Sequence, residues 1–150
     1  MTTRTDDTPI KIMMVPGGKV PVQATPGSAA YDLFARAVRF NSETRTLECD
    51  LGVRVEIPEG WCGLLLPRSS VLRHGLMMAN SVGLIDSDYR GELRATFRVV
   101  SDGSMVTWYE EGDRCAQIMF IPVPATRLEA VDRLSDTARG EGGHGSSGTR

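Results

Sequence analysis

The stretch N-S-V-G-L-I-D-S-D-Y-R-G-E-L-R, residues 80–94, organises the rest of the chain. Two apolar runs, Val82 to Ile85 and Leu93 to Phe97, flank a short acidic segment, which is the pattern of a β-hairpin. On an extended chain Asp86 and Asp88 share one face, so the hairpin tip would present two carboxylates. Turn chemistry alone also selects Asp and Gly. The stretch therefore predicts either a polar turn or a carboxylate held beside apolar walls as a general base.

Short strands between Gly and Pro turns are predicted on both sides of this stretch. Residues 46–57 alternate between apolar and polar side chains and predict the clearest strand, which ends at Pro58. A second hairpin is predicted from residues 95–100 and 105–109. Further strands are predicted over residues 10–15, 61–66 and 114–121. The pattern indicates a mostly β protein with a single domain.

The composition excludes several classes of protein. The 150 residues carry a net charge of -2, without the basic excess of a nucleic-acid or membrane-surface binder. Three cysteines without C-x-x-C spacing indicate neither a disulfide framework nor a zinc site. With no signal peptide and no long apolar run, we expect a cytoplasmic, soluble protein that binds neither nucleic acid nor membrane.

Several polar residues need an explanation. Asp32 lies in a predicted apolar strand. It is either a buried, hydrogen-bonded structural group or a carboxylate that reaches a metal through water. Gln117 interrupts an apolar face and either serves a backbone gap or contacts a ligand. Arg68 and the hydroxyls of Ser69 and Ser70 begin a short helical turn, with Ser69 as its predicted cap, where anions bind well. The glycine-rich residues 137–150 are either a disordered end or an arm that closes on an anion.

Five segments of the chain, in order, resemble the motifs of the trimeric dUTP pyrophosphatase (dUTPase) family. They are A-A-Y-D-L (29–33), P-R-S-S (67–70), N-S-V-G-L-I-D-S-D-Y-R-G-E (80–92), G-D-R-C-A-Q-I (112–118) and R-G-E-G-G-H-G-S-S-G (139–148). The resemblance implies an all-β fold, a compact jelly roll or distorted β-barrel (a β-clip) with one short helix. It also implies a body of residues 1–136 and a flexible C-terminal arm of residues 137–150 that closes the active site.

The resemblance implies hydrolysis of dUTP to dUMP and pyrophosphate with Mg²⁺, which keeps uracil out of DNA and supplies dUMP. Asp86 is similar to the base that activates water at the α-phosphate, and Asp32 to the carboxylate that reaches the metal through water. The implied phosphate contacts are Arg68, Ser69, Ser70, Gln117, Arg139, Ser146, Ser147 and Gly148. The implied uracil and deoxyribose contacts are Asn80, Gly83, Ile85, Tyr89 and His144.

The sequence departs from the family pattern at three positions. Ala30 and Ser70 stand where many members have Gly, and His144 stands where many have the stacking Phe. The family's sites form between three subunits, so a homotrimer with shared active sites is implied. Two other interpretations stay open: a dCTP deaminase-related enzyme, and a non-catalytic nucleotide-binding or regulatory protein of the same fold.

Overall fold

The computed structural model describes residues 8–101 and 107–142. Its regular structure is almost entirely β, which confirms the predicted all-β class, and its one helix in these ranges is the 3₁₀ helix η1 (Ser69–Arg73). The strands are β1 (Lys11–Met14), β2 (Tyr31–Phe34), β3 (Ala37–Asn41), β4 (Thr46–Asp50), β5 (Val53–Glu56), β6 (Trp61–Pro67), β7 (Leu76–Met78), β8 (Gly83–Ile85), β9 (Arg94–Val99) and β10 (Arg114–Pro122).

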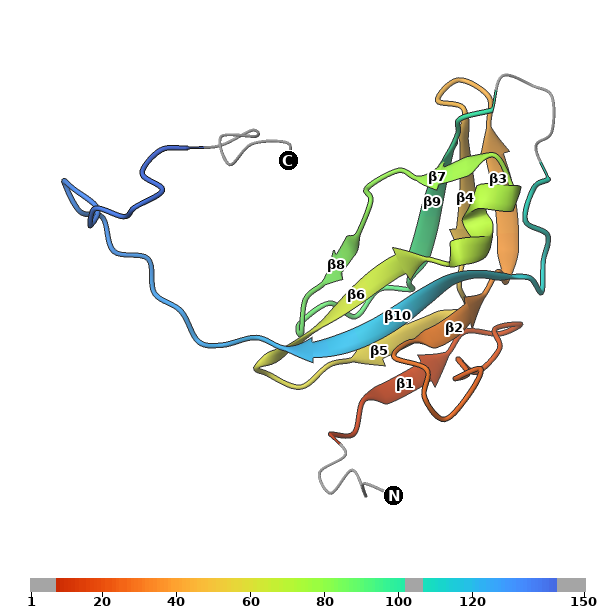
Figure 1. Cartoon of the computed structure of the whole chain (residues 1–150). Helices are drawn as coiled ribbons and strands as arrows, with labels where there is room; N and C mark the ends of the chain where they lie inside the picture. Colours follow the sequence, from red (N-terminus) through yellow and green to blue (C-terminus); the bar gives the residue numbers. More distant parts are fainter. Residues whose placement is uncertain (1–7, 102–106, 143–150) are drawn as a thin grey trace.

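The strands form three antiparallel sheets that do not close into a barrel (Figure 1). One four-stranded sheet has the order β2-β10-β6-β8, the other has the order β3-β4-β9-β7, and β1 pairs with β5. β6 and β10 form the longest pair, with seven residues of each strand in register from Ala116 opposite Pro67 to Pro122 opposite Trp61. This pair is the support from which the polar residues described below extend.

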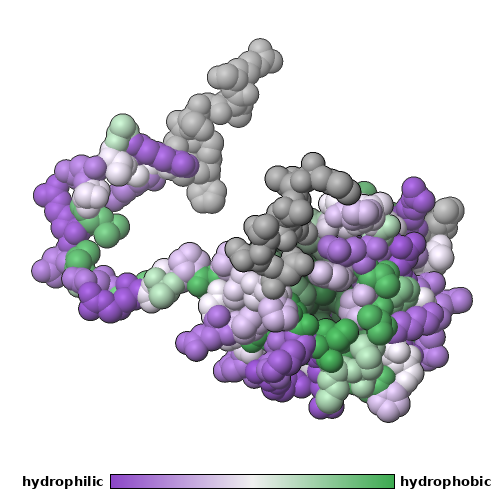
Figure 2. Space-filling view, turned by 90° about the horizontal axis from the view of Figure 1, so that it is seen from below, coloured by the Kyte–Doolittle hydropathy of each residue, from purple (hydrophilic) through white to green (hydrophobic). Residues whose placement is uncertain are grey.

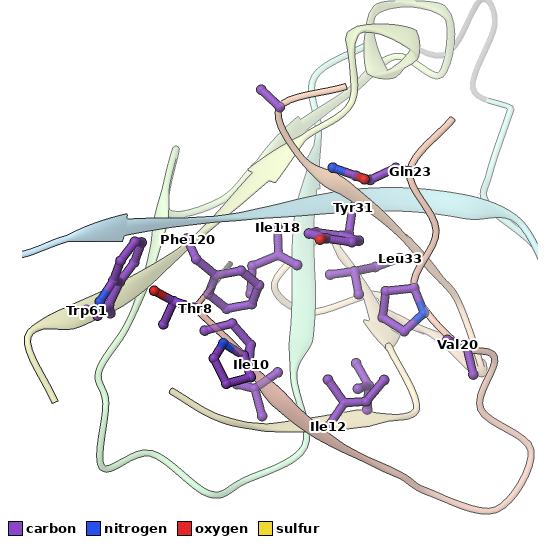
Figure 3. A pocket seen from close by; sticks show the side chains of 15 residues that line it. Thr8, Ile10, Ile12, Val20, Gln23, Tyr31, Leu33, Trp61, Ile118 and Phe120 are labelled. Carbon is purple, nitrogen blue, oxygen red and sulfur yellow. The ribbon is translucent and has the colours of Figure 1, made fainter. Parts of the chain in front are cut away.

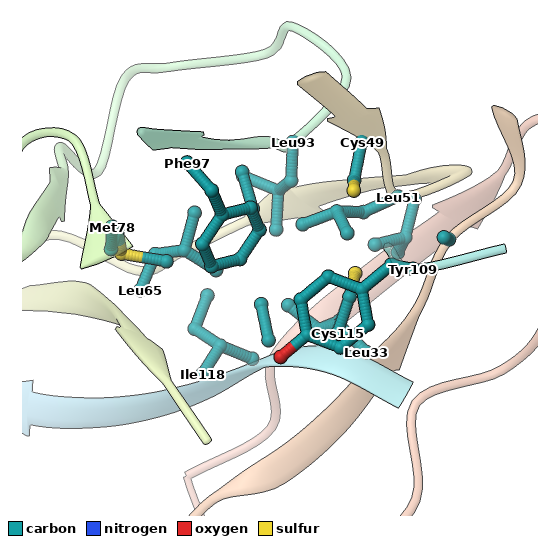
Figure 4. Packing of buried hydrophobic residues seen from close by; sticks show 14 of the residues in the cluster. Leu33, Cys49, Leu51, Leu65, Met78, Leu93, Phe97, Tyr109, Cys115 and Ile118 are labelled. Carbon is teal, nitrogen blue, oxygen red and sulfur yellow. The ribbon is translucent and has the colours of Figure 1, made fainter. Parts of the chain in front are cut away.

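The core lies between the two larger sheets (Figure 4). Phe97 of β9 is fully buried and faces Leu33 of β2 and Ile118 of β10 across the cluster. Truncation of such a ring in a close-packed interior typically costs about 3–5 kcal/mol. The three cysteines are buried and free, and they pack as small apolar side chains.

The hairpin predicted around Asp86 is wrong. β8 pairs with β6, whereas β9 pairs with β4 and β7, so the two apolar runs lie in different sheets. The segment between them is a crossing turn, in which the Tyr89 N–H donates to the Asp86 carbonyl at 3.2 Å. Because Asp86 and Asp88 lie in a turn, the alternation of an extended chain does not apply to them. Residue patterning detected both strands correctly but could not specify their partners.

The long strand predicted over residues 46–57 is divided into β4 and β5. Gly52 interrupts it with φ +67, a conformation that favours glycine. Its backbone also contacts Gly18 so closely that a Cβ on Gly18 would overlap the Gly52 carbonyl. The chain thereby changes sheet between Asp50 and Val53.

The second predicted hairpin can be compared with the structure only in part. β9 supplies its first strand, residues 105 and 106 lie outside the described residues, and residues 107–109 form no strand. After β10 the chain leaves the body, and residues 123–142 contain no strand (Figure 1). Two apolar side chains of this tail, Leu128 and Leu134, are 100% and 80% exposed. A boundary at residue 136 remains a prediction.

Candidate active site

Asp32 of β2 is the centre of a polar cluster. The residue is only 7% exposed, and its two carboxylate oxygens face two arginines. Arg68 Nε donates to Oδ1 at 2.9 Å, and Arg114 Nη1 donates to Oδ2 at 3.1 Å. A buried charge of this kind is tolerated because it is paired and hydrogen-bonded. Asp32 therefore holds both guanidinium groups at one end of the β2-β10-β6 sheet.

Arg68 connects β6 to η1 and is itself the N-cap residue of the helix. The predicted cap at Ser69 is wrong: the extended backbone of Arg68 already begins the helix, and no side chain caps it. Arg68 Nη1 donates to the Arg114 carbonyl at 3.1 Å and approaches Ser70 Oγ at a long 3.4 Å. Among the described residues, Arg68 Nη2 has no partner. One edge of the guanidinium is thus fixed, and the other is free for an anion.

Gln117 lies opposite Asp32 in the β2–β10 pair, so it belongs to the same cluster. Its Nε2 donates to the Pro67 carbonyl at 2.9 Å, which is the backbone-gap alternative considered from the sequence. This hydrogen bond fixes the backbone of Pro67, the residue directly before Arg68. Arg114 was missed from sequence, although it stands only three positions before Gln117 on the same strand.

The segment from Asn80 to Ile85 forms the edge of the β6–β8 pair. Gly83 is buried, and a Cβ there would press on Leu65 and on the Asn80 side chain. The Asn80 side chain therefore lies against the Gly83 backbone. Ser81 adopts a left-handed φ of +60 between them. Of the residues implied to contact uracil, Asn80, Gly83 and Ile85 are thus brought onto one short edge strand and the bend before it.

Asp86 follows β8 and is exposed in the single chain. It borders a small pocket of about 260 Å³ whose other walls are Leu84, Ile85, Tyr89, Leu93 and Arg94. The Tyr89 hydroxyl donates to the Glu92 carbonyl at 3.2 Å, and the ring lies so close to Gly91 that a Cβ there would overlap it. The pocket thus combines mainly apolar walls with the Asp86 carboxylate.

Glu92 fixes the end of this turn and was not identified from sequence. Its carboxylate accepts two bonds from Arg36, at 3.0 and 3.2 Å, and one from the Gly52 N–H at 2.9 Å. The turn is thereby attached to the corner between β4 and β5. In the sequence, Glu92 was marked only by its position as the last residue of the segment 80–92.

The two groups of polar residues lie at different ends of β6. Ile85, directly before Asp86, pairs with Gly63, five positions before Arg68. At about 3.3 Å per residue this is roughly 16 Å along the strand. Asp86 and Asp32 therefore do not meet within one chain.

The remaining predicted residues lie in the tail. Arg139 donates through Nε to the Gly142 carbonyl at 2.8 Å, in a local turn. The segment after β10, to which this turn belongs, extends away from the body (Figure 1). His144, Ser146, Ser147 and Gly148 lie outside the described residues. Arg139 is therefore not assembled with Arg68 or Asp86 in the single chain.

A wide groove lies elsewhere, on the side of β1 and β5 (Figures 2 and 3). It has about 940 Å³ and is lined mainly by apolar side chains such as Ile12, Tyr31, Trp61 and Phe120, and none of the described residues in its lining is charged. Such a lining suits an apolar partner and not a triphosphate.

Within residues 8–101 and 107–142, no three His, Cys, Asp or Glu side chains group as metal ligands. None of the helices in this part of the chain is long and apolar enough to cross a membrane.

Comparisons with known proteins identify relatives of this chain. The chain is 45% identical over 107 residues to the deoxyuridine 5'-triphosphate nucleotidohydrolase of Escherichia phage T5, and the aligned region covers 71% of each chain. It is 40% identical over 134 residues to the enzyme of the same name from Tolumonas auensis, and this aligned region covers 86% of this chain and 87% of that one.

Solved structures show the same fold. The dUTPase of Staphylococcus bacteriophage 80alpha, solved with dUPNHPP, superposes with a TM-score of 0.82 at 26% identity, over 95% of this chain and 100% of that one. A second solved structure is a point variant of the dUTPase from phage phi11 of S. aureus, which coordinates a structural Mg(II) ion. It superposes with a TM-score of 0.72 at 22% identity, over 84% of this chain and 98% of that one. The dUTPase family model matches residues 17–148, and the chain therefore belongs to the dUTPase family.

Proposed function

We propose that this protein hydrolyses dUTP to dUMP and pyrophosphate, so that uracil is kept out of DNA and dUMP is supplied. The observation that carries the proposal is the family match over residues 17–148, which includes both groups of polar residues, around Asp32 and around Asp86, and most of the tail. The nucleotidohydrolases of phage T5 and Tolumonas auensis support the reaction. The dUPNHPP bound to the 80alpha enzyme supports the substrate.

Asp86 is proposed as the general base that takes a proton from the water attacking the α-phosphorus. Its exposed carboxylate, directly after the short strand β8, is accessible to a substrate and to water. Tyr89 would pack beside the deoxyribose, and the Gly83 and Ile85 backbone with Asn80 would read the uracil edge. A fixed set of backbone donors and acceptors rejects cytosine because the wrong edge leaves buried polar groups unpaired.

Arg68 is proposed to bind the phosphates through its free Nη2 edge while Asp32 holds the Nε edge. Ser69 and Ser70 add hydroxyls at the same turn, and Gln117 keeps its backbone in place. From the arm we propose Arg139, His144, Ser146, Ser147 and Gly148 as contacts to the phosphates and the base.

Mg²⁺ is proposed as the cofactor. Asp32 is a single carboxylate already shared by two arginines, and the residues that the structure describes add no cluster of further metal ligands around it. It fits an ion that keeps most of its waters and binds through substrate phosphates, with Asp32 reached through water. The ion would neutralise phosphate charge, and the residues above would orient the substrate.

We propose a homotrimer with shared active sites. The roughly 16 Å along β6 between the two polar groups supports this, because a base must lie within hydrogen-bond reach of the water it activates. The exposed Leu128 and Leu134 of the tail and the apolar groove also need partners. A cytoplasmic location fits three free, buried thiols.

The reaction is tested by pyrophosphate release from dUTP, dCTP, dTTP and UTP with Mg²⁺, for the native chain and for Asp86→Asn. We expect cleavage of dUTP only, and its loss in the variant with dUTP affinity retained. Ammonia release from dCTP would instead identify a deaminase. Binding of dUTP without cleavage by the native chain would favour the regulatory alternative.

The shared site is tested by mixing two inactive variants. Asp86→Asn and Arg68→Ala each damage a different group of residues. If each site combines groups from different chains, subunits refolded together should regain part of the native activity, because some sites then contain neither substitution. Activity that stays at the level of the separate variants in mixed trimers would argue against sharing.

A further inference from the structure

The ring of Tyr89 is held by the main chain of its own turn. Its hydroxyl donates to the Glu92 carbonyl at 3.2 Å, and the ring lies directly against Gly91. The residue is 43% exposed and lines the small pocket beside Asp86. Because so much of the side chain is exposed, the position of the ring depends on the hydroxyl bond and on the backbone of the turn.

The Glu92 carboxylate attaches the end of this turn to two other parts of the chain. Arg36, between β2 and β3, forms a bidentate pair with it, through Nε at 3.0 Å and Nη2 at 3.2 Å. The Gly52 N–H, between β4 and β5, donates to Oε1 at 2.9 Å. The side chains of Arg36 and Glu92 are only 26% and 22% exposed, so salt screens the pair less than it would at an open surface. Bidentate, charge-assisted bonds of this kind fix direction as well as distance.

The carbonyl that accepts the Tyr89 hydroxyl belongs to the peptide unit between Glu92 and Leu93. The N–H of that unit donates to the Val53 carbonyl at 2.9 Å. In a planar trans peptide the N–H and C=O groups point in opposite directions, so the bond to Val53 directs the Glu92 carbonyl to the side of Tyr89. The acceptor of the hydroxyl is therefore fixed twice, by this backbone bond and by the carboxylate of Glu92 itself.

Two glycines make room for Arg36. A Cβ on Gly52 would lie 3.2 Å from Arg36 Cβ and Cδ, and a Cβ on Gly17 would lie 3.6 Å from its Cγ. The stem of Arg36 thus packs on the backbone of both turns, which restricts the directions in which its guanidinium can point. The pair of Arg36 and Glu92 is therefore a built attachment, made from residues that the proposed mechanism does not use.

We propose that Arg36 and Glu92 are positioning residues that set the sugar specificity of the site. Their ion pair holds the Glu92 carbonyl, the carbonyl holds the Tyr89 hydroxyl, and the ring is kept as a fixed wall beside the sugar. The 2'-hydroxyl of a ribonucleotide needs space that a fixed wall denies. The inference rests on the proposed dUTP hydrolysis and on the proposed contact of Tyr89 with the deoxyribose. The described lining of the pocket includes neither Arg36 nor Glu92, so both act through Tyr89.

The test uses Glu92→Gln, which keeps the size of the side chain and removes its charge. The glutamine NH₂ group cannot accept a bond from the guanidinium, so the bidentate pair is lost. The measurement is kcat/KM for dUTP and for UTP with Mg²⁺. The ratio of the dUTP value to the UTP value should fall about ten-fold, because a ring that can move admits the 2'-hydroxyl.

A second variant breaks the same pair from the other side. Arg36→Lys keeps the positive charge but cannot form the two parallel bonds, and it should lower the ratio by a similar factor. The double variant with Glu92→Gln should show little further fall, because both changes remove one interaction. Additive falls would mean that the two residues act independently and would overturn the proposal.

Two comparisons separate this role from a merely structural one. Glu48→Gln makes the same chemical change at a glutamate of β4 whose carboxylate lies 3.6 Å from Arg39, and the ratio should not change. Tyr89→Phe removes the hydroxyl and should lower the ratio by itself. In that background Glu92→Gln should have little further effect, because the link between the ion pair and the ring is already broken. An equal fall with and without the Tyr89 hydroxyl would contradict the proposed link.

The proposal and the proposed function fail in different ways. If the native protein hydrolyses dUTP and both Glu92→Gln and Arg36→Lys keep the native ratio, the positioning role is wrong and the function stands. A lower unfolding temperature with an unchanged ratio would show that the ion pair serves the fold alone. Equal cleavage of dUTP and UTP by the native protein would overturn the sugar wall but not the hydrolysis. If the native protein neither binds nor cleaves dUTP, both are overturned.

Discussion

Replacement of Asp50 by Asn should weaken the fold in a pH-dependent way. Asp50, at the end of β4, has a side chain that is 8% exposed and is shared by arginines from two neighbouring strands. Arg39 contacts it at 2.6 and 3.1 Å, and Arg94 Nε at 2.8 Å. These hydrogen bonds lower the pKa of Asp50 from 3.8 to about 2 in spite of its burial, and the bonds from Arg39 have the largest effect.

The magnitude follows from that pKa. At about 1.36 kcal/mol for each tenfold change in proton affinity, a fall from 3.8 to about 2 corresponds to about 2.4 kcal/mol of folding free energy. Because the pKa is lowered in the folded state, this contribution is complete above 3.8 and is lost as the pH falls toward about 2. Asp50→Asn removes it and leaves the arginines facing one another, so we expect a loss of at least about 2 kcal/mol near pH 7.

The assay is urea unfolding of the native chain and the variant at one fixed protomer concentration, because assembly also contributes to stability. The series should extend from about pH 7 to the lowest pH at which both remain folded. The matched control is Glu56→Gln, which breaks the exposed Lys11–Glu56 pair at 2.7 Å and should leave the midpoint unchanged. Equal stability of Asp50→Asn and the native chain at pH 7, or a difference that does not shrink on acidification, would refute the reasoning.

Three further substitutions test other parts of the structure. Gly18→Ala should lower the free energy of unfolding by about 1–3 kcal/mol in urea, because its Cβ would overlap the Gly52 carbonyl, whereas Gly27→Ala has open space and should have little effect. Gly91→Ala should displace the Tyr89 ring and raise the KM for dUTP several-fold in steady-state assays; an unchanged KM would contradict the proposed sugar contact. Arg114→Gln removes one of the two cations on Asp32 and should lower kcat/KM about ten-fold, and native kinetics would show that Arg68 alone suffices.

Local patterns predicted most of the strands but not their partners. β6 and β10 were expected close to their observed bounds, because apolar runs ended by Pro are local signals. The β8–β9 hairpin was wrong, because residues 86–92 have the composition of a turn whether it joins neighbours in one sheet or crosses between two. The break at Gly52 depends on its contact with Gly18, far away in the sequence.

The candidate site shows the same limit. Asp32 and Gln117 could be selected as polar residues in apolar strands, and Arg68 as the start of a helical turn, and the structure brings the three together. Arg114 and Glu92 act through partners that are distant in sequence, so no local signal distinguished them from ordinary surface charges. The separation of Asp86 from Asp32 depends on the β6–β8 register, which patterning cannot supply.

The position of β10 has a consequence for how a newly synthesised chain folds. It is the last strand in sequence among the described residues, yet it lies between β2 and β6 and pairs with both. The ribosome must therefore translate past Pro122 before this sheet can form, and the contact between Asp32 and its partner strand closes a very long loop. Until then, β2 and β6 present unpaired hydrophobic edges, the kind of surface that aggregates or binds chaperones. Premature termination anywhere before β10 thus yields a chain that is prone to aggregate, and not a smaller stable domain.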